Sequence, residues 1–203
     1  MYKYPLIIFE GVEGSGKTTQ IKNVKSYLRK NRIKFISLRE PGGSKLAEKI
    51  RKLILNPKSN FHPFTDLLLY IAARNENVNS IIKKHYKKRV ILIDRFIYST
   101  LAYQHYGMNL NLNIINKLNN FILGNIKPDL IFLHTVNILE LKKRIQKRKE
   151  KNRYDKFDIN FYDKVQKGYI KMLKRKKNVT IIDTKKTIRE NKFEILKKIN
   201  KIF

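Results

Sequence analysis

Residues 6–20 constrain the fold of this chain more than any other part of the sequence. They read LIIFEGVEGSGKTTQ, in which Gly11, Gly16, Lys17 and Thr18 fit the phosphate-binding pattern G-x-x-x-x-G-K-[ST]. The apolar run before the glycines does not alternate with polar residues, as is typical of a parallel strand covered on both faces. The stretch therefore predicts a strand, a phosphate-binding loop (P-loop) and the start of a helix, in that order.

The chemistry of this loop follows from its backbone. Glycines at 11, 14 and 16 let successive N–H groups turn inward, and the helix that begins near Lys17 adds its unpaired N–H groups and the positive end of its dipole. In this pattern Lys17 reaches the β- and γ-phosphates and the hydroxyl of Thr18 ligates Mg²⁺. We expect the nucleotide to be bound by consecutive residues, namely Gly11, Val12, Glu13, Gly14, Ser15, Gly16, Lys17, Thr18 and Thr19.

Strand-type and helix-type segments alternate along the rest of the chain. Short apolar runs predict further strands, at 33–38, 90–93, 130–133 and 179–182. Amphipathic stretches predict helices, at 17–30, 44–56, 65–74, 97–106, 113–123, 137–145, 161–173 and 189–202. The alternation predicts an α/β fold in three layers, with a five-stranded parallel sheet flanked by helices. We expect residues 1–203 to form a single domain.

The composition adds one unusual property, a formal net charge of +30 from 46 Lys and Arg against 16 Asp and Glu. Such a charge is typical of nucleic-acid-binding proteins. The excess is mostly Lys, spread along nearly every polar face beside abundant Ile and Asn, and this favours a drift in composition over a functional polyanion site. We therefore do not expect nucleic acid to be a functional partner.

Two absences bear on where the chain works. It has no Cys, so a disulfide framework is excluded and a reducing cytoplasm is the expected location. No window approaches the roughly 18 apolar residues of a membrane-spanning helix, and no leader pattern precedes the first strand, so no membrane partner is expected. The four histidines, His62, His85, His105 and His134, lack the spacing of metal ligands and are expected to be structural or surface residues.

The third predicted strand ends in Asp94 and Arg95. An arginine at this point lies across from the P-loop and can hold a second phosphate with two parallel hydrogen bonds. The alternative is an arginine that pairs with a carboxylate at the edge of the core. If the first interpretation holds, the acceptor already bears a phosphate group.

A basic segment at about 142–158 is expected to form a short lid. Its cations are Lys142, Lys143, Arg144, Lys147, Arg148, Lys149, Lys151 and Arg153, whereas the variable positions of the P-loop contain none. Phosphoryl transfer needs positive charge near the transferred group, which a closing lid can supply. We interpret residues 147–156 as a mobile loop. The chain is Lys-rich throughout, however, so the charge of this segment alone is a weak indication.

In order and spacing, the motifs resemble those of the thymidylate kinase family over essentially the whole chain. They are FEGVEGSGKTTQ at 9–20, REPGGSKLAEKIR at 39–51, LLLYIAARNE at 67–76, DRFIYSTLAYQ at 94–104, PDLIFL at 128–133 and NRYDKFD at 152–158. The resemblance implies a P-loop kinase fold and ATP- and Mg²⁺-dependent phosphorylation of dTMP to dTDP, in the synthesis of dTTP. A deoxynucleoside kinase and a basic nucleic-acid-binding P-loop protein are the alternatives.

The resemblance also implies roles for individual residues. Lys17, Arg95 and Arg153 would be catalytic, Arg153 acting from the lid on the transferred phosphoryl group. The dTMP site would comprise Glu13, Arg39, Pro41, Tyr70, Arg74, Arg95, Ser99, Thr100, Tyr103 and Gln104. Mg²⁺ would lie near Thr18, Glu13, Glu40 and Asp94.

Within the dTMP site, Tyr70 would stack on thymine and Arg74, one helical turn later, would bond a thymine carbonyl. Ser99 or Thr100 would meet the base edge. Tyr103 would crowd the ribose 2′ carbon and Glu13 would accept a hydrogen bond from the 3′-OH. Such proteins are homodimers, which agrees with the apolar helix at 66–73. The chain departs from the family pattern at Phe96 and Thr135, where a polar ring residue and Asp are frequent.

Overall fold

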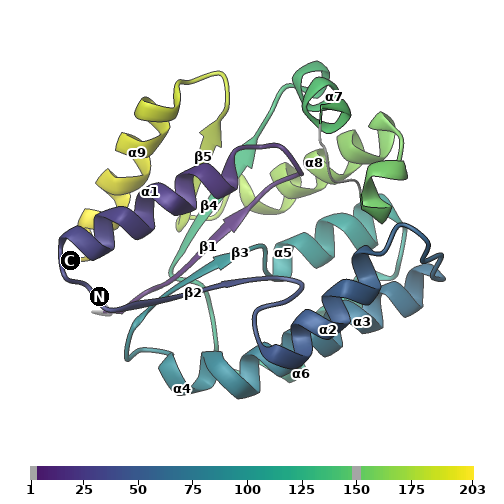
Figure 1. The fold of residues 1–203 in the computed structure, drawn as a ribbon, viewed down its shortest axis with the longest axis horizontal. Coiled ribbons are helices and arrows are strands. Elements are labelled where there is room, and N and C mark those ends of the chain that lie inside the picture. The colour runs from purple at the N-terminus through teal and green to yellow at the C-terminus, as the bar shows by residue number, and fades with distance from the viewer. Residues whose placement is uncertain (1–3, 148–151) are drawn as a thin grey trace.

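The computed structural model describes residues 4–147 and 152–203. At its centre lies a five-stranded parallel sheet with the order β2–β3–β1–β4–β5 (Figure 1). The strands are β1 (Leu6–Glu10), β2 (Phe35–Arg39), β3 (Val90–Asp94), β4 (Leu130–Thr135) and β5 (Val179–Asp183). The predicted fold class is thereby confirmed.

Helices connect each strand to the next. They are α1 (Lys17–Lys30), α2 (Lys45–Leu55), α3 (Pro63–Asn77), α4 (Lys83–His85), α5 (Ile97–Thr100), α6 (Leu112–Leu123), α7 (Ile138–Gln146), α8 (Ile159–Leu173) and α9 (Ile188–Asn200). Two π-helices, η1 (Val78–Ile82) and η2 (Leu101–Gly107), and one 3₁₀-helix, η3 (Arg153–Lys156), lie between them. No helix among the described residues is long and apolar enough to cross a membrane.

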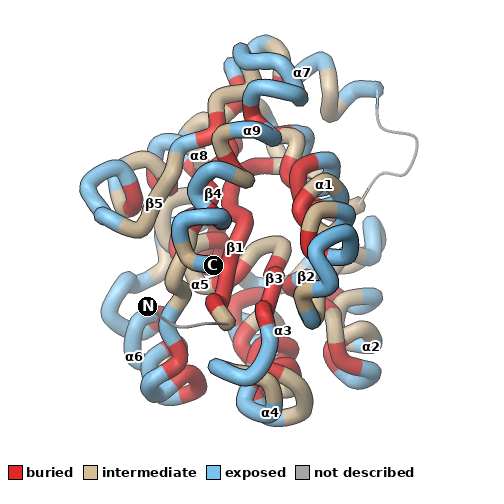
Figure 2. The backbone as a smooth tube through the Cα atoms, turned by 90° about the vertical axis from the view of Figure 1, so that its left-hand side faces the viewer, coloured by how far each residue is buried: buried red, intermediate tan, exposed pale blue. Residues whose placement is uncertain are grey.

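The sheet is covered on both faces because its central strands are apolar on both sides. Ile7 and Phe9 of β1 belong to a core that includes residues of α1 and α9. Leu6 and Ile8 point to the opposite face, into a larger core with residues of α2, α3, η2 and α8. Figure 2 shows β1 and β3 as buried along their length. The unalternating apolar run at 6–9 is explained by this two-sided burial.

Several predicted boundaries are confirmed. Helix α1 spans 17–30 as predicted, and the hydroxyl of Ser44 caps α2 by accepting a hydrogen bond from the N–H of Ala47 at 3.3 Å. Gly124 ends α6 with a φ of 52°, in the region that favours glycine.

Other local predictions are confirmed only in part. The helix predicted at 97–106 is α-helical only to Thr100 and continues as the π-helix η2. At the start of α7 the side chain of Asn137 accepts a hydrogen bond from the N–H of Leu139, and the carboxylate of Glu140 pairs with Arg144 at 2.8 Å. The loop predicted at 147–156 contains η3, and its residues 148–151 lie outside the described part of the chain.

Parallel strands bring three loops to one edge of the sheet. The P-loop follows β1, the loop at 40–44 follows β2, and Arg95 follows β3. Phe9 of β1 pairs in register with Asp94 of β3, so the P-loop and Arg95 start from neighbouring positions. Ligands of open α/β sheets bind outside this carboxyl edge.

Candidate active site

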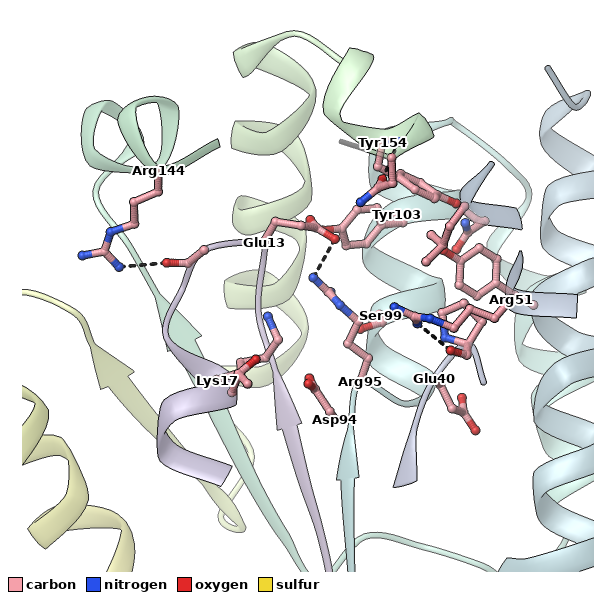
Figure 3. Close-up of a pocket in the computed structure, with 17 residues that line it drawn as sticks. Glu13, Lys17, Glu40, Arg51, Asp94, Arg95, Ser99, Tyr103, Arg144 and Tyr154 are labelled. Carbon is pink, nitrogen blue, oxygen red and sulfur yellow. Dashed lines mark hydrogen bonds and ion pairs between the residues drawn. The ribbon is translucent and has the colours of Figure 1, made fainter. Parts of the chain in front are cut away.

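A cavity of about 380 Å³ opens at this edge (Figure 3). It is lined by Glu13, Gly14, Lys17, Thr18, Glu40, Pro41, Arg51, Leu55, Tyr70, Asp94, Arg95, Ser99, Tyr103, Gln104, Arg144, Asn152 and Tyr154. Most of the residues predicted for the acceptor and the metal are in this set. The structure thus brings together P-loop, strand-end and helix residues that lie far apart in the chain, from Glu13 to Tyr154.

The side chain of Lys17 is hydrogen-bonded to the backbone of the P-loop. Its ammonium donates to the backbone oxygens of Gly11 at 2.8 Å and Val12 at 2.7 Å, and its side chain is almost fully buried. Burial, assisted by the nearby positive charge of Arg95, lowers the pKa of Lys17 to about 8. Gly11 has a φ of 135° and lies against the carbonyl oxygen of His134, which leaves no room for a Cβ.

The other residues that were expected to bind the nucleotide differ in how far they are exposed. Val12 is fully buried in the core, and Thr19 is exposed but does not line the cavity. Gly14 lies at the rim, where its carbonyl oxygen accepts a hydrogen bond from Arg144 of α7 at 2.8 Å (Figure 3). Arg144 is therefore the lid-segment cation, among those described, that contacts the P-loop.

Arg95 faces the cavity from the end of β3. Its Nη2 pairs with Oε1 of Glu13 at 2.9 Å, and its guanidinium lies 5.2 Å from the centre of the Tyr103 ring. The hydroxyl of Tyr103 donates to the other oxygen of Glu13. Burial alone would raise the pKa of Glu13, but the charges of Arg95 and Lys17 outweigh it and the pKa is lowered. Arg95 thus pairs with a carboxylate, as the second interpretation expected, and it also lines the cavity in which the first interpretation would place a phosphate.

Two carboxylates at the cavity have an oxygen without a partner among the described residues. Oδ1 of Asp94 and Oε1 of Glu40 are buried and make no hydrogen bond. Asp94 and Thr18 both line the cavity on the P-loop side, so an oxygen-ligated cation fits there. Glu40 is less available, because its Oε2 accepts from Nε of Arg74 at 2.8 Å. Burial raises the pKa of Glu40.

Arg74 and Thr100 do not line the cavity. Arg74 is buried behind its wall, where it donates to Glu40, to Asn119, and to Oγ1 of Thr100 at 2.9 Å. A buried guanidinium requires such partners, and here they take its donors. The structure therefore does not show the expected contacts of these two residues with the base edge, whereas Tyr70 does line the cavity.

Arg153 also lies away from the P-loop, contrary to expectation. Its guanidinium pairs with Asp66 of α3 and lies 5.0 Å from the centre of the Tyr154 ring. Asp66 is fully buried and needs a cation, which is the physical reason for this placement. Arg39, the second predicted phosphate ligand, is exposed, pairs with Glu48 at 3.0 Å and lines an adjoining cavity with Arg95.

The geometry agrees with comparisons to known proteins. The family model for thymidylate kinase matches residues 9–195. The chain belongs to the thymidylate kinase family. A thymidylate kinase of Mycoplasma capricolum is 41% identical over 90% of this chain and 88% of the relative. A thymidylate kinase of Thermosipho africanus is 38% identical over 95% and 96%. A crystal structure of thymidylate kinase from Ehrlichia chaffeensis superimposes with a TM-score of 0.79, with 30% identity, over 97% and 98% of the two chains.

Family membership confirms the expected reaction class, the phosphorylation of dTMP to dTDP by a nucleotide-dependent kinase. Within this family site, sequence reasoning overlooked several residues. Arg51 lines the cavity and donates to the carbonyl oxygen of Pro41 at 2.6 Å. It is the last residue of the quoted motif REPGGSKLAEKIR, but no role was assigned to it. Asp66 lies one residue before the quoted motif LLLYIAARNE, and Glu10, although it stands within the quoted motif FEGVEGSGKTTQ, was assigned no role.

Proposed function

We propose that this cavity transfers the γ-phosphoryl group of ATP to the 5′-phosphate of dTMP, giving dTDP and ADP. The observation that carries the proposal is the arrangement of Lys17 and Arg95. Arg95 directly follows β3, Lys17 begins α1 after the P-loop that follows the adjacent strand β1, and both line one cavity. Lys17 would supply charge to the donor phosphates and Arg95 to the acceptor phosphate.

The P-loop would hold the donor. Its inward N–H groups and the ammonium of Lys17 match the charge of the β- and γ-phosphates. Because Lys17 is buried and bonded to backbone oxygens, it needs little reorganisation to stabilise charge that develops on the transferred group.

Thr18 and Asp94 would hold Mg²⁺ at the same edge. Asp94 offers a buried oxygen without a hydrogen-bond partner among the described residues, and Thr18 lines the cavity beside it. Few protein ligands are needed, because Mg²⁺ is usually completed by phosphates and water. When bound, the ion would neutralise negative charge on the donor phosphates. Glu13 fits this role less well, since Arg95 and Tyr103 occupy both of its oxygens.

The acceptor would lie between Arg95 and the aromatic residues of the cavity. Tyr70 is placed to stack on thymine, and Tyr103 and Glu13 to contact the sugar. Arg74 would act on the base only after a change of side-chain conformation, because its donors are bound to Glu40, Asn119 and Thr100. Arg144 is the better-placed lid cation for the transferred group, since it already contacts Gly14, whereas Arg153 is paired with Asp66.

We also propose that the protein is a homodimer in which α3 contributes to the interface. Phe64 and Leu68 of α3 are 39% and 44% exposed, so this mostly apolar helix presents two large apolar side chains to solvent. The cytoplasmic location stays a prediction that rests on the absence of Cys.

Two alanine variants test the proposed mechanism. Lys17→Ala and Arg95→Ala should each lower kcat/KM for dTMP phosphorylation by roughly 10²–10³ or more, because each removes a preorganised cation from the reacting phosphates. Circular dichroism melts would show that both variants fold, and ADP release would measure turnover. Near-wild-type activity in either folded variant would contradict the mechanism.

A further inference from the structure

A buried hydrogen-bond network lies directly behind Arg95, and two of its three members, Glu10 and Tyr169, have been given no role so far. It joins Glu10 at the end of β1, Ser99 on α5 and Tyr169 on α8. All three side chains are buried, Glu10 and Tyr169 completely. The network therefore comes from three separate elements that meet beneath the proposed acceptor-phosphate site.

Glu10 is bound to the segment that carries Arg95. Its Oε1 accepts hydrogen bonds from the backbone N–H groups of Phe96 at 3.0 Å and Tyr98 at 3.2 Å. These donors belong to the start of α5, where the N-cap residue Phe96 makes no side-chain cap bond of its own. Arg95 itself has a φ of 64°, which is unfavourable for a residue with a Cβ. The carboxylate of Glu10 thus binds the backbone immediately after Arg95, the residue whose φ is strained.

The second oxygen of Glu10 continues the network toward the guanidinium. Oγ of Ser99 donates to Oε2 of Glu10 at 2.6 Å and lies 2.6 Å from the hydroxyl of Tyr169. Nη1 of Arg95 donates to both hydroxyls, at 3.4 Å to Ser99 and 3.3 Å to Tyr169. The face of the guanidinium and its other end are held by Tyr103 and Glu13.

The direction of the hydroxyl protons follows from the partners at the two ends. An ionised carboxylate accepts only, and a guanidinium donates only. With Glu10 ionised, the Ser99 proton points to Oε2 of Glu10, and the Tyr169 proton points to Ser99 or, at 3.4 Å, to the same carboxylate oxygen, so both hydroxyls present lone pairs to Arg95. Without the carboxylate, either hydroxyl can rotate its proton toward the guanidinium and repel it.

We propose that Glu10, Ser99 and Tyr169 are positioning residues that orient Arg95 toward the acceptor phosphate, with Glu10 setting the direction of the hydroxyl chain. The inference rests on the proposed function, because it presumes that Arg95 binds the 5′-phosphate. Since Tyr169 belongs to α8, which follows the lid segment, the network also links the acceptor site to the element next to the lid.

The test compares a ligand that has the phosphate with one that lacks it. Tyr169→Phe removes one hydroxyl and keeps the ring, which packs edge-on against Tyr103. Calorimetry should show dTMP binding weakened by about tenfold, the size expected for a hydrogen bond to a charged group, and thymidine binding changed by less than about twofold. In an Arg95→Ala background the same change should have no further effect on dTMP, since the group it orients is gone.

Tyr162→Phe is the matched control, because Tyr162 is also buried on α8 but its hydroxyl donates to the carbonyl oxygen of Tyr154. It should change the affinities for dTMP and thymidine by the same factor. Glu10→Gln and Ser99→Ala should reproduce the phosphate-specific loss of Tyr169→Phe, and Ser99→Ala keeps the test decisive if the Glu10 variant does not fold.

Equal losses for dTMP and thymidine in Tyr169→Phe, no loss for either ligand, or a loss that persists without Arg95 would overturn the inference. The two proposals fail in different ways. If Arg95→Ala binds dTMP as tightly as the wild type, the assigned role of Arg95 is wrong and the inference falls with it. If Arg95→Ala loses affinity and Tyr169→Phe does not, only the positioning network is wrong.

Discussion

At the scale of single residues, Lys17 carries a testable signature of its environment. Its pKa is lowered to about 8 because burial disfavours the charged ammonium and Arg95 repels it. As the pH rises through this value, free enzyme loses the proton and with it the charge that attracts the phosphates of ATP. The loss is therefore expected on the alkaline side of the pH profile.

The prediction is that kcat/KM for ATP falls above about pH 8, whereas kcat falls only at higher pH, because bound phosphates restore the charged form. Initial rates from pH 6 to 10 would measure both. Lys17→Arg is the control: its residual activity should show no decline in this range, since a guanidinium stays protonated. A flat kcat/KM profile in the wild type would show that Lys17 is not the titrating group.

Residue identities at the site were largely predictable, and side-chain orientations were not. The motif around Lys17 and the Asp94–Arg95 strand end follow from local sequence, and both line the cavity. Arg74 and Arg153 were expected at the ligand, but their partners Glu40 and Asp66 lie 34 and 87 positions away. A pairing between such distant groups leaves no periodic trace in the sequence.

At the scale of elements, Asp66 connects three helices around the base side of the cavity. It lies on α3 and accepts from Arg153 of η3, from the hydroxyl of Tyr154 at 2.8 Å and from Nε2 of Gln104 on η2 at 3.0 Å. Tyr154 and Gln104 line the cavity. The carboxylate of Asp66 therefore positions two residues that line the cavity from different helices, Tyr154 on η3 and Gln104 on η2.

We predict that Asp66→Asn lowers the free energy of unfolding by roughly 3 kcal/mol, because it leaves the buried charge of Arg153 without its partner. The melting temperature should fall by roughly 6–12 °C, which calorimetry measures. Lys186→Gln is the control, since its pair with Glu194 is exposed and screened by solvent and should change the melting temperature far less. An equal effect of the two variants would contradict the structural role of Asp66.

Strands and amphipathic helices were predictable because the spacing of apolar residues along each segment reflects which of its side chains are buried. The π-helix at 101–107 was not, since one extra residue per turn changes neither composition nor the apolar pattern enough to be read. That segment carries Tyr103 and Gln104, so the deviation from α-helix occurs where the chain forms the site.

At the scale of the whole molecule, the charge of +30 is distributed over both faces of the sheet. Exposed cations lie, for example, on α1 at Lys22 and Arg29 and on α8 at Lys164 and Lys167. A dedicated nucleic-acid site concentrates such residues on one face or groove. That nucleic acid is not a functional partner stays a prediction.

The proposed dimer gives a prediction at the same scale. Leu68→Glu on α3 should convert a dimer to a monomer in sedimentation velocity, because it places a charge in an apolar interface. Phe193→Glu, at a more exposed position on α9 across the sheet, should leave the dimer intact. A wild-type monomer at micromolar concentration, or a dimer unaffected by Leu68→Glu, would show that the interface is assigned wrongly.

The central claim is that the cavity accepts a thymine nucleotide through its phosphate. The most direct test is an ADP-release assay with Mg·ATP and dTMP, dUMP, dCMP, dAMP, dGMP and thymidine offered in parallel. We expect strong preference for dTMP over the other acceptors, and little turnover of thymidine, because Arg95 then has no phosphate to bind. Phosphorylation of thymidine without phosphorylation of dTMP would contradict the assignment and place the chain among enzymes that act on nucleosides.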